Sequence, residues 1–429
     1  MIPRKTITRH LKIFRKNGYV PSAGSEKINL NRKKIKAWER LTMKRVEIKK
    51  GIYWVGGIDR NLRNFHGYLT QRGSTYNAYL IIDEKILLVD TVKHYLCDEM
   101  LQRIRTVIDP SEINYVISNH VEMDHSGSLP MLMKLCPDAT VITSPNGEKG
   151  LKKHYKADWK LKVVNTGEAI NIGRRNPRFV LTQMVHWPDS MATYIPEDKL
   201  LLPNDAFGQH IASPERFDDQ VGWDIVREEA AKYYANIVLP YGAQVDKALE
   251  ALSGLDIDMI APSHGIIWRK YLGEIIGLYK EWANNITSAK ATIVYDTMWG
   301  STEKIAEAIY EIFEDKGIPS HLMSLKTNHI SDIMTRILNS KYICVGSPTL
   351  NNGLLPTVSA FLTYMKGLAP KGRRGLAFGS YGWGGQSIGE IEGVLGSCGF
   401  DMLKGIKVQY VPDENTINGI KEQLKGGIS

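Results

Sequence analysis

The sequence predicts two α/β domains in tandem, preceded by a basic N-terminal extension. Residues 43–288 contain strand-like apolar runs that are each followed by a histidine or a carboxylate. In residues 289–429, strand-like runs end in loops of small and hydroxyl-bearing residues, and the first of these loops leads into an amphipathic helix. Strands that alternate with helices favour layered α/β sheets, and 429 residues suffice for two or three domains.

A string of six residues in the first domain predicts a metal site. The string His120-Val121-Glu122-Met123-Asp124-His125 follows the apolar run 113–118, which is expected to form a buried strand. Two imidazoles and two carboxylates suit a first-row transition metal better than calcium or magnesium. Four ligands so close in sequence can hardly all face one ion, so the string predicts two metals.

Further strand-like runs in this domain also end in potential metal ligands. The runs and their ligands are 179–185 with His186, 200–202 with Asp205, and 257–261 with His264. Because sites in layered α/β folds tend to lie at the carboxyl ends of strands, we expect these side chains to join the first four. The resulting four histidines and three carboxylates are enough for two metals that share one carboxylate.

This pattern resembles the metallo-β-lactamase superfamily, whose fold is an αββα sandwich with a two-metal site. The common zinc hydrolases of that superfamily have a histidine where this chain has Glu122. A carboxylate adds negative charge and a harder oxygen donor, which shifts the preference from zinc toward iron. Glu122 and the strings 186–191, 204–210 and 261–265 resemble the flavodiiron proteins, also called A-type flavoproteins. The resemblance covers the chain from about Met43 to its C-terminus.

A phosphate-binding loop is predicted after the first strand of the second domain, 291–296. A helix is expected over 303–317, with Ile305, Ala306, Ile309, Ile312 and Phe313 on one face. Hydroxyl groups and backbone N–H groups at a helix N-terminus form an anion site. The loop resembles the one that holds the FMN phosphate in flavodoxins, which are doubly wound parallel sheets, and it lacks the lysine of a Walker loop. Its residues are Thr297, Met298, Trp299, Gly300, Ser301 and Thr302.

Two more loops resemble those that flank the flavin ring of flavodoxins. They follow the predicted strands 342–346 and 375–379, as the switch-point rule for such sheets requires. Tyr381 or Trp383 is available to stack against the ring. The loops are Ser347-Pro348-Thr349-Leu350-Asn351-Asn352-Gly353 and Ser380-Tyr381-Gly382-Trp383-Gly384-Gly385.

The resemblance implies one FMN and two irons per chain, and it assigns the iron ligands. It also places His66 and either Tyr233 or Tyr234 near the metals, where they would supply protons or hydrogen bonds. In this family the histidine that matches His125 is not always seen on the metal. The implied ligands are His120, Glu122 and His186 for one iron, Asp124, His125 and His264 for the other, and Asp205 as the bridge.

The positive charge of the chain is concentrated near its N-terminus. Residues 1–43 hold 12 Lys and Arg against 2 Asp and Glu, whereas the rest holds 43 against 44. We expect residues 1–42 to be dispensable, or not native, rather than a nucleic-acid-binding arm. Without a membrane-length apolar run or a secretory signal, a cytoplasmic protein is expected. The four cysteines form no CxxC pair, which predicts no rubredoxin-like iron site and therefore an external electron donor.

The function implied by the resemblance is the reduction of dioxygen to water, an oxygen-detoxifying reaction that takes electrons from a reduced donor through FMN to the two irons. Nitric oxide is the alternative substrate within the family, and rubredoxin or a reduced deazaflavin coenzyme is the expected donor. Glu122 and the flavin loops disfavour a zinc hydrolase, and the complete ligand set disfavours a plain electron carrier. A head-to-tail homodimer, or a dimer of dimers, is implied, in which the FMN of one chain faces the irons of its partner. Neither nucleic acid nor a membrane is expected as a partner.

Overall fold

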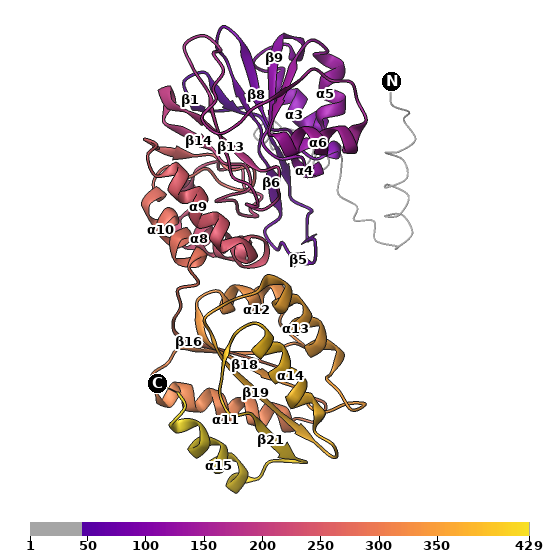
Figure 1. Cartoon of the computed structure of the whole chain (residues 1–429), viewed down its shortest axis with the longest axis vertical. Helices are drawn as coiled ribbons and strands as arrows, with labels where there is room; N and C mark the ends of the chain where they lie inside the picture. The colour runs from indigo at the N-terminus through magenta and orange to yellow at the C-terminus, as the bar shows by residue number, and fades with distance from the viewer. Residues whose placement is uncertain (1–44, 429) are drawn as a thin grey trace, which may run out of the picture. The chain divides into compact units, whose positions relative to one another are not determined.

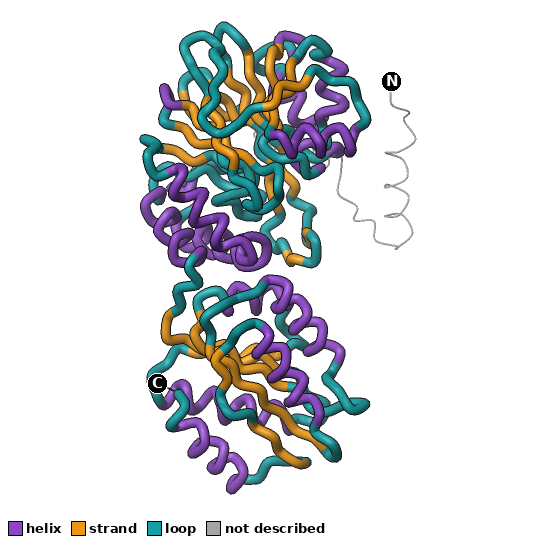
Figure 2. The backbone as a smooth tube through the Cα atoms, in the orientation of Figure 1, coloured by secondary structure: helices purple, strands orange, loops and turns teal. Residues whose placement is uncertain are grey.

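The computed structural model describes residues 45–428, so the predicted extension 1–42 lies outside the described residues. The described residues are built from layered sheets and helices (Figures 1 and 2). The strand that opens the second α/β region begins at Ser288. None of the helices in the described part of the chain combines the length and the apolar character that a bilayer crossing requires.

The first α/β region contains two sheets that pack face to face. Apolar side chains of both sheets, such as Trp54 and Ile117 of one and Phe179 and Leu202 of the other, share one buried cluster. The larger sheet has the order β1 (Val46–Lys49), β2 (Ile52–Trp54), β7 (Tyr79–Ile81), β8 (Ile86–Val89), β9 (Ile113–Ser118), β10 (Thr140–Thr143) and β11 (Leu161–Val163). The smaller has the order β12 (Arg178–Leu181), β13 (Met191–Ile195), β14 (Leu200–Leu202) and β15 (Met259–Ile260).

Helices cover the outer face of each sheet. On the larger sheet they are α3 (Cys97–Ile104), α5 (Leu129–Leu135) and α6 (Pro145–Tyr155), whose apolar faces join the side chains of β9 and β10. On the smaller sheet they are α8 (Trp223–Tyr233), α9 (Gly242–Leu252) and α10 (Leu272–Ala283). The predicted αββα sandwich is therefore confirmed. Two antiparallel strand pairs lie outside these two sheets, namely β3 (Gly57–Asp59) with β6 (Ser74–Tyr76), and the hairpin of β4 (Asn64–Phe65) with β5 (Tyr68–Leu69).

The second α/β region is a parallel sheet with helices on both faces (Figure 1). Its strand order is β17 (Ser320–Ser324), β16 (Ser288–Tyr295), β18 (Ser340–Gly346) and β19 (Arg374–Tyr381), and β20 (Asp401–Met402) and β21 (Ile406–Gln409) both pair with β19. Such an order, with the first strand inside the second, is that of a flavodoxin-like doubly wound sheet. Helices α11 (Ser301–Asp315) and α15 (Glu414–Lys425) pack on one face, and α12 (Ile330–Ile337), α13 (Pro356–Leu368) and α14 (Gln386–Ser397) pack on the other. The predicted fold class is confirmed for both regions.

Several predicted elements have different ends in the structure. Strand β12 stops at Leu181 rather than at residue 185, because the chain turns between Thr182 and Ser190 and Met184 adopts a left-handed conformation with φ 64°. His186 therefore lies inside a loop instead of directly after a strand. The helix expected over 303–317 spans Ser301–Asp315 instead.

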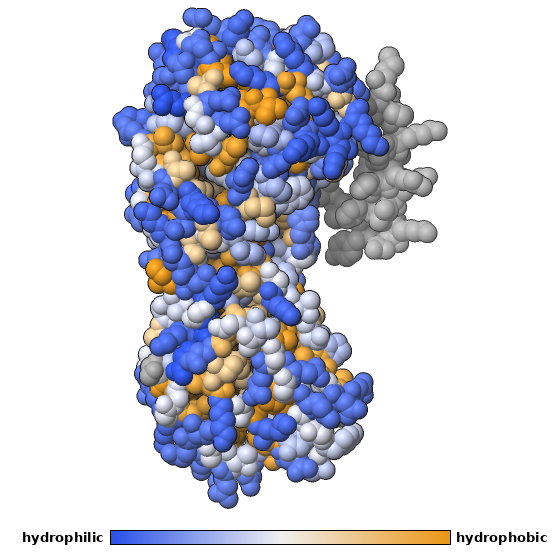
Figure 3. Space-filling model, viewed as in Figure 1, coloured by the Kyte–Doolittle hydropathy of each residue, from blue (hydrophilic) through white to orange (hydrophobic). Residues whose placement is uncertain are grey.

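The predicted buried face of α11 agrees with the structure. Ile305, Ala306, Ile309, Ile312 and Phe313 are all buried against β16 and its neighbours. Exposed positions of the molecule are mostly hydrophilic, and Figure 3 shows apolar residues only in scattered groups on the face that is visible there.

Candidate functional site

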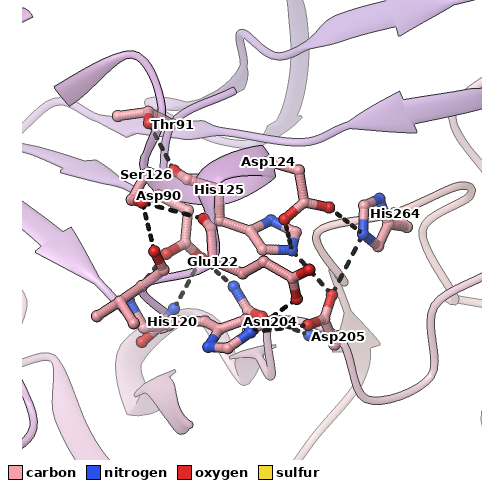
Figure 4. A network of polar contacts seen from close by, with 12 residues as sticks. Asp90, Thr91, His120, Glu122, Asp124, His125, Ser126, Asn204, Asp205 and His264 are labelled. Carbon is pink, nitrogen blue, oxygen red and sulfur yellow. Dashed lines mark hydrogen bonds and ion pairs between the residues drawn. The ribbon is translucent and has the colours of Figure 1, made fainter. Parts of the chain in front are cut away.

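The His120–His125 string lies between β9 and the short helix α4 (Met123–Ser126), as its sequence predicts. The backbone carbonyl of His125 accepts hydrogen bonds from the amide of Thr91 at 2.9 Å and from its hydroxyl at 2.5 Å. The Ser126 hydroxyl donates to the carbonyl of Val121 at 2.6 Å. These bonds fix the turn that brings Asp124 and His125 back toward His120 (Figure 4).

A buried carboxylate, Asp90, ties two of the ligand-bearing loops together. It accepts hydrogen bonds from the amide of Asn119 at 2.8 Å and from the side-chain amide of Asn204 at 3.1 Å. These asparagines immediately precede His120 and Asp205 in the sequence. Asp90 at the end of β8 thus sets the position of one loop from each sheet, a role that was not predicted from the sequence.

All seven side chains predicted as metal ligands come together, in two groups. Within each group, one donor atom per residue lies within 4.8 Å of every other. His186 belongs with the first group although it lies in a loop. The first group is His120, Glu122, His186 and Asp205, and the second is Asp124, His125 and His264.

Asp205 faces both groups, with one carboxylate oxygen toward each. Its Oδ2 lies 3.3 Å from Nε2 of His186 and 3.7 Å from Nε2 of His120. The other oxygen, Oδ1, lies 3.0 Å from Nε2 of His125 and 3.3 Å from Nε2 of His264. One carboxylate between two sets of ligands is the geometry that a bridged pair of metals requires.

The donor set fits two metal ions. Both carboxylate oxygens of Asp124 and of Asp205, and both ring nitrogens of His125, are buried and make no hydrogen bond of regular geometry among the described residues, although these oxygens lie 3.0–3.7 Å from histidine nitrogens of the site. Such orphaned groups are costly unless they bind something. Ligands that each lie about 2.1 Å from one ion, at tetrahedral or octahedral angles, are about 3.0–3.4 Å apart. The nitrogen-to-oxygen distances around Asp205 are close to this range.

The electrostatics of the site also favour cations. Burial lowers the pKa of His125, but the carboxylates of Asp124 and Asp205 outweigh this effect and raise it to about 9. Burial likewise opposes the charge on Asp205, yet the neighbouring histidines hold its pKa well below the usual value. The carboxylates of Asp124 and Asp205 therefore carry negative charge and favour a proton on His125. Metal ions at the site would take the place of that proton.

Hydrogen bonds orient two of the imidazoles. Nδ1 of His120 lies 2.9 Å from Asp189, and Nδ1 of His264 lies 2.9 Å from the carbonyl oxygen of Thr75, so that each ring presents Nε2 to the site. Such partners fix the tautomer of a ligating histidine. Asp189 also accepts a hydrogen bond from the amide of Val121 at 2.7 Å. Sequence reasoning gave Asp189 no role, although it lies within the string 186–191 that signalled the family.

The sequence analysis expected His66 and either Tyr233 or Tyr234 near the metals. In the structure, His66 and Tyr233 lie beside the ligands and Tyr234 does not. His66, at the turn between β4 and β5, places Nε2 3.1 Å from Oε1 of Glu122 while its side chain is 70% exposed. The buried ring of Tyr233 lies 5.9 Å from the ring of His264. The alternative candidate, Tyr234, points elsewhere and packs on Tyr279 and Trp282.

His210 is a further buried side chain at this site that the sequence analysis did not identify. Its Nδ1 lies 2.8 Å from the Ser74 hydroxyl, and its ring packs on those of Tyr233 and His264. Burial is the main cause that lowers the pKa of His210 well below its usual value, so the ring is neutral near pH 7.

The flavin-binding loops line a cavity of about 770 Å³ at the carboxyl ends of β16, β18, β19 and β21. This volume lies within the range typical of cofactor pockets. Most of the predicted loop residues line it, but Thr297, Gly300, Thr302, Ser347, Gly353, Gly384 and Gly385 do not. Among the latter, the buried hydroxyl of Thr302 bonds to that of Ser380 at 3.0 Å and so joins two loops from behind. The lining residues are Met298, Trp299, Ser301, Pro348, Thr349, Leu350, Asn351, Asn352, Ser380, Tyr381, Gly382, Trp383, Tyr410 and Val411.

Tyr410 and Val411 were missed because the strand before them was not predicted. In β21, Ile406 and Val408 are buried while Lys407 and Gln409 are exposed, an alternation that would have identified the strand. Tyr410 directly follows it at the same edge of the sheet as the predicted loops.

The cavity fits an aromatic phosphate ester such as FMN. The amide of Gly300 donates to the Thr297 hydroxyl at 3.0 Å, and Gly300 has φ 85°, so the loop wraps around the N-terminus of α11. A Cβ atom added at Gly300 would meet nothing within 4 Å, which leaves room for a phosphate group beside the helix terminus. Trp299 and Trp383 are 92% and 80% exposed, and they offer flat apolar surfaces beside this loop.

Comparison with known proteins identifies a family for each of the two α/β regions. A family model described as ODP family beta lactamase matches residues 75–265, and a flavodoxin model matches residues 293–423. A nitric oxide reductase of Moorella thermoacetica is 47% identical, with 86% of this chain and 94% of that protein covered. A rubredoxin-oxygen oxidoreductase of Megalodesulfovibrio gigas is 44% identical over the same shares.

A solved structure extends the likeness to the whole fold. The crystal structure of the flavodiiron protein from Giardia intestinalis has a TM-score of 0.86 and 34% identity, with 89% of this chain and 95% of that chain covered. The match therefore spans both α/β regions and the elements that carry the seven clustered ligands. The chain belongs to the flavodiiron protein family.

Proposed function

We propose that this flavodiiron oxidoreductase reduces dioxygen to water, with FMN and a di-iron site as its cofactors. The observation that carries the proposal is Asp205, whose two oxygens face two separate groups of ligands. The 44% identity to a rubredoxin-oxygen oxidoreductase supports dioxygen as the substrate. Two irons and a flavin, when bound, supply the four electrons that one dioxygen needs to become two waters.

In the proposed site, each side chain has a separate task. His120, Glu122 and His186 would hold one iron, Asp124, His125 and His264 the other, and Asp205 would bridge them. Asp189 and the carbonyl of Thr75 keep Nε2 of His120 and of His264 directed at the metals. Two metals this close can bind both ends of a diatomic molecule.

Tyr233 and His66 are the proposed proton donors. Burial raises the pKa of Tyr233 well above its usual value, so its hydroxyl keeps its proton at neutral pH. His66 contacts Glu122 on one side and solvent on the other, which suits a group that carries protons inward. Reduction of one dioxygen consumes four protons along with the four electrons.

Nitric oxide reduction is the second candidate. It is favoured by the 47% identity to a nitric oxide reductase, which covers the same share of the chain. Both gases are small diatomic molecules that a di-iron site can bind, so the ligands alone do not separate the two reactions.

We further propose rubredoxin as the electron donor, with a reduced deazaflavin coenzyme as the alternative, and a head-to-tail homodimer or dimer of dimers as the active unit. The relatives that bear rubredoxin in their names support the first proposal. Exposed apolar side chains support the proposed dimer. They occur at the flavin cavity, in Trp299, Trp383 and Tyr410, and at the metal site, in Met123 between Glu122 and Asp124.

An anaerobic assay of the full chain tests the function. The protein, loaded with iron and FMN and reduced through rubredoxin, is mixed with dioxygen or with nitric oxide, and consumption and products are recorded. We expect dioxygen to be consumed about tenfold faster or more, without release of hydrogen peroxide. Faster consumption of nitric oxide would transfer the assignment to the second candidate, and natively expressed protein that contains zinc and no iron would exclude both.

A further inference from the structure

Two segments of the first α/β region carry side chains that border the metal site without belonging to its ligand set. The hairpin of β4 and β5 carries His66, whose Nε2 lies 3.1 Å from Glu122. Helix α8 carries Tyr233, whose ring packs against those of His264 and His210. The hairpin is small, since β4 and β5 have only two residues each, and α8 ends in a π-helical turn, Tyr234–Val238.

Both segments are tied to the same pair of residues in the flavin-binding region. The Ser331 hydroxyl, fully buried at the start of α12, accepts a hydrogen bond from the amide of Leu69 in β5 at 3.1 Å. The next residue, Asp332, accepts from the side-chain amide of Gln71 at 3.0 Å and pairs with the ammonium group of Lys232 in α8 at 2.5 Å. Lys232 directly precedes Tyr233 and is itself 5% exposed.

A third tie runs through the π-helical turn. A π-helical turn leaves backbone groups without their regular partners. The side-chain amide of Asn236 donates to the carbonyl of Lys232 at 2.8 Å and to the carbonyl of Ser331 at 3.1 Å. Its Oδ1 accepts from the hydroxyl of Tyr364 in α13 at 2.9 Å. The irregular end of α8 is therefore completed by groups from α12 and α13.

The convergence of these bonds on two adjacent residues points to a role beyond general packing. Buried hydrogen bonds and ion pairs hold one geometry, because each partner that is lost leaves an unpaired polar group. His66 of the hairpin contacts Glu122 and Tyr233 of α8 contacts His264, and both segments are bonded to the first turn of α12. A shift of α12 would move His66 and Tyr233 together.

We propose that Ser331 and Asp332, although they belong to the flavin-binding region, are positioning residues for the di-iron site of the same chain. They hold His66 and Tyr233 in place through Leu69, Gln71 and Lys232. The proposal rests on the proposed function for the identity of the metals, but the contacts themselves do not depend on which gas is reduced.

The test is the double variant Ser331→Ala/Asp332→Asn in the full chain loaded with iron and FMN. Hydrogen–deuterium exchange of the segments 62–70 and 226–238 is measured together with the electron paramagnetic resonance spectrum of the partly reduced iron site. We expect exchange in both segments to rise about fivefold or more, because local opening no longer breaks these bonds. The iron spectrum should change and kcat with dioxygen should fall about tenfold, whereas FMN content should stay at the wild-type level.

Control variants separate positioning from a general loss of packing. Thr335→Val removes a hydroxyl one turn further along α12 that bonds only within the helix, to the carbonyl of Ser331, and it should leave both segments and the iron spectrum unchanged. Ser331→Thr, with Asp332 unchanged, keeps the hydroxyl group and should show the wild-type iron spectrum. If the double variant does not fold, Gln71→Leu removes the bonds of this side chain to Asp332 and to Lys232 and should raise exchange in both segments, by less than the double variant.

One result would overturn the proposal, namely faster exchange confined to α12 with the iron spectrum and kcat unchanged. Failure of the proposed function would look different. In that case the wild-type protein would not reduce dioxygen, whereas the changes in exchange and in the iron spectrum between variant and wild type would persist.

Discussion

Asp205 gives the clearest example of how a single residue determines chemistry at this site. Its two oxygens face different histidines, Oδ2 toward His186 and Oδ1 toward His125, at 3.3 and 3.0 Å. Two dications held a few ångströms apart repel each other strongly in a buried site, and a carboxylate between them offsets this repulsion. Each of the other six ligands serves one metal in the proposed arrangement, so Asp205 alone combines binding with charge compensation between the metals.

The variant Asp205→Asn tests this role. It keeps the size of the side chain but removes the negative charge between the metals, and we expect iron content to fall from about two to about one per chain. Dioxygen turnover should fall by about 100-fold or more, since loss even of an outer partner of a ligand typically costs 10–100-fold. Elemental analysis and an oxygen electrode measure both effects. Asp138→Asn, at an exposed position, is the control, and full iron content in Asp205→Asn would contradict the bridging role.

Glu229 predicts how the stability of the fold depends on pH. Burial raises its pKa from 4.5 to about 7, although Arg72, 2.9 Å away, and Lys232 both oppose this shift. Between about pH 4.5 and pH 7, Glu229 keeps its proton in the folded chain but has lost it in the unfolded chain. The contribution of Glu229 to the free energy of unfolding therefore falls as pH rises through this range. The full effect is on the order of 3 kcal/mol.

The variant Glu229→Gln replaces the titrating carboxyl group with an amide that is neutral at every pH. Its Tm relative to the wild type should therefore increase between pH 5 and pH 8, as followed by circular dichroism. Glu228→Gln removes a neighbouring charge that helps to raise the pKa of Glu229, and it should change the pH profile much less than Glu229→Gln does. Parallel profiles for Glu229→Gln and the wild type would show that Glu229 is ionised in the folded state throughout this range.

At the scale of elements, the N-terminus of α11 borders the flavin cavity through Met298, Trp299 and Ser301, and the turn between them passes through Gly300, which does not itself line the cavity. Gly300 has φ 85°, a left-handed conformation that favours glycine, and the space where a Cβ atom would extend is open. We propose that the FMN phosphate fills this space. Gly317, just after the other end of the same helix, has φ 66° and the same open surroundings without a cavity.

Gly300→Ala and Gly317→Ala form a matched pair of variants. Both add a methyl group at a left-handed position and should destabilise the protein by about 1 kcal/mol. Only Gly300→Ala should weaken FMN binding, by about tenfold or more, because its methyl group enters the phosphate site. Titration of the FMN-free protein by flavin fluorescence measures the affinity. Equal affinities in the two variants would place the phosphate elsewhere.

The elements that follow simple sequence patterns were predicted well. The runs 113–118 and 200–202 coincide with β9 and β14, since each is bounded by polar or turn-forming residues that end a strand. Short-range metal motifs are equally visible, because Glu122, Asp124 and His125 share one turn of chain.

Other features depend on contacts that a single sequence does not reveal. Asp90 is 29 residues from Asn119 and 114 from Asn204, and nothing in its local sequence shows that it joins their loops. The choice between Tyr233 and Tyr234 depends on the rotation of α8 as it enters the π-helical turn, and that turn is stabilised by Ser331, nearly one hundred residues later. The end of β12 was missed because its alternating pattern continues into a turn.

For the whole molecule, the exposed apolar side chains indicate how chains associate. Trp299, Trp383, Tyr410 and Val411 all line the flavin cavity and are more than half exposed, and apolar groups of this kind mark interaction surfaces. Met123, 55% exposed beside Glu122, lies at the proposed iron site. A two-fold interface that joins these two surfaces would create two flavin-to-iron contacts at once.

Complementation between two inactive variants tests this assembly. Glu122→Ala should lose iron, and Gly300→Val should lose FMN. If the two are co-expressed and carry different affinity tags, heterodimers isolated through both tags should regain up to about half of the wild-type turnover, because one of their two flavin-to-iron pairs is intact. Each variant alone should be inactive. Wild-type turnover in a preparation shown to be monomeric by light scattering would contradict the dimer.

In the proposed site, the seven clustered side chains hold two irons with Asp205 between them. Anomalous diffraction from crystals of the natively expressed protein, recorded above and below the iron absorption edge, tests it most directly. We expect two iron peaks about 3.5–4 Å apart, one beside His120, Glu122 and His186, the other beside Asp124, His125 and His264, with one Asp205 oxygen on each. A single peak, or peaks that appear only at the zinc edge, would contradict the account.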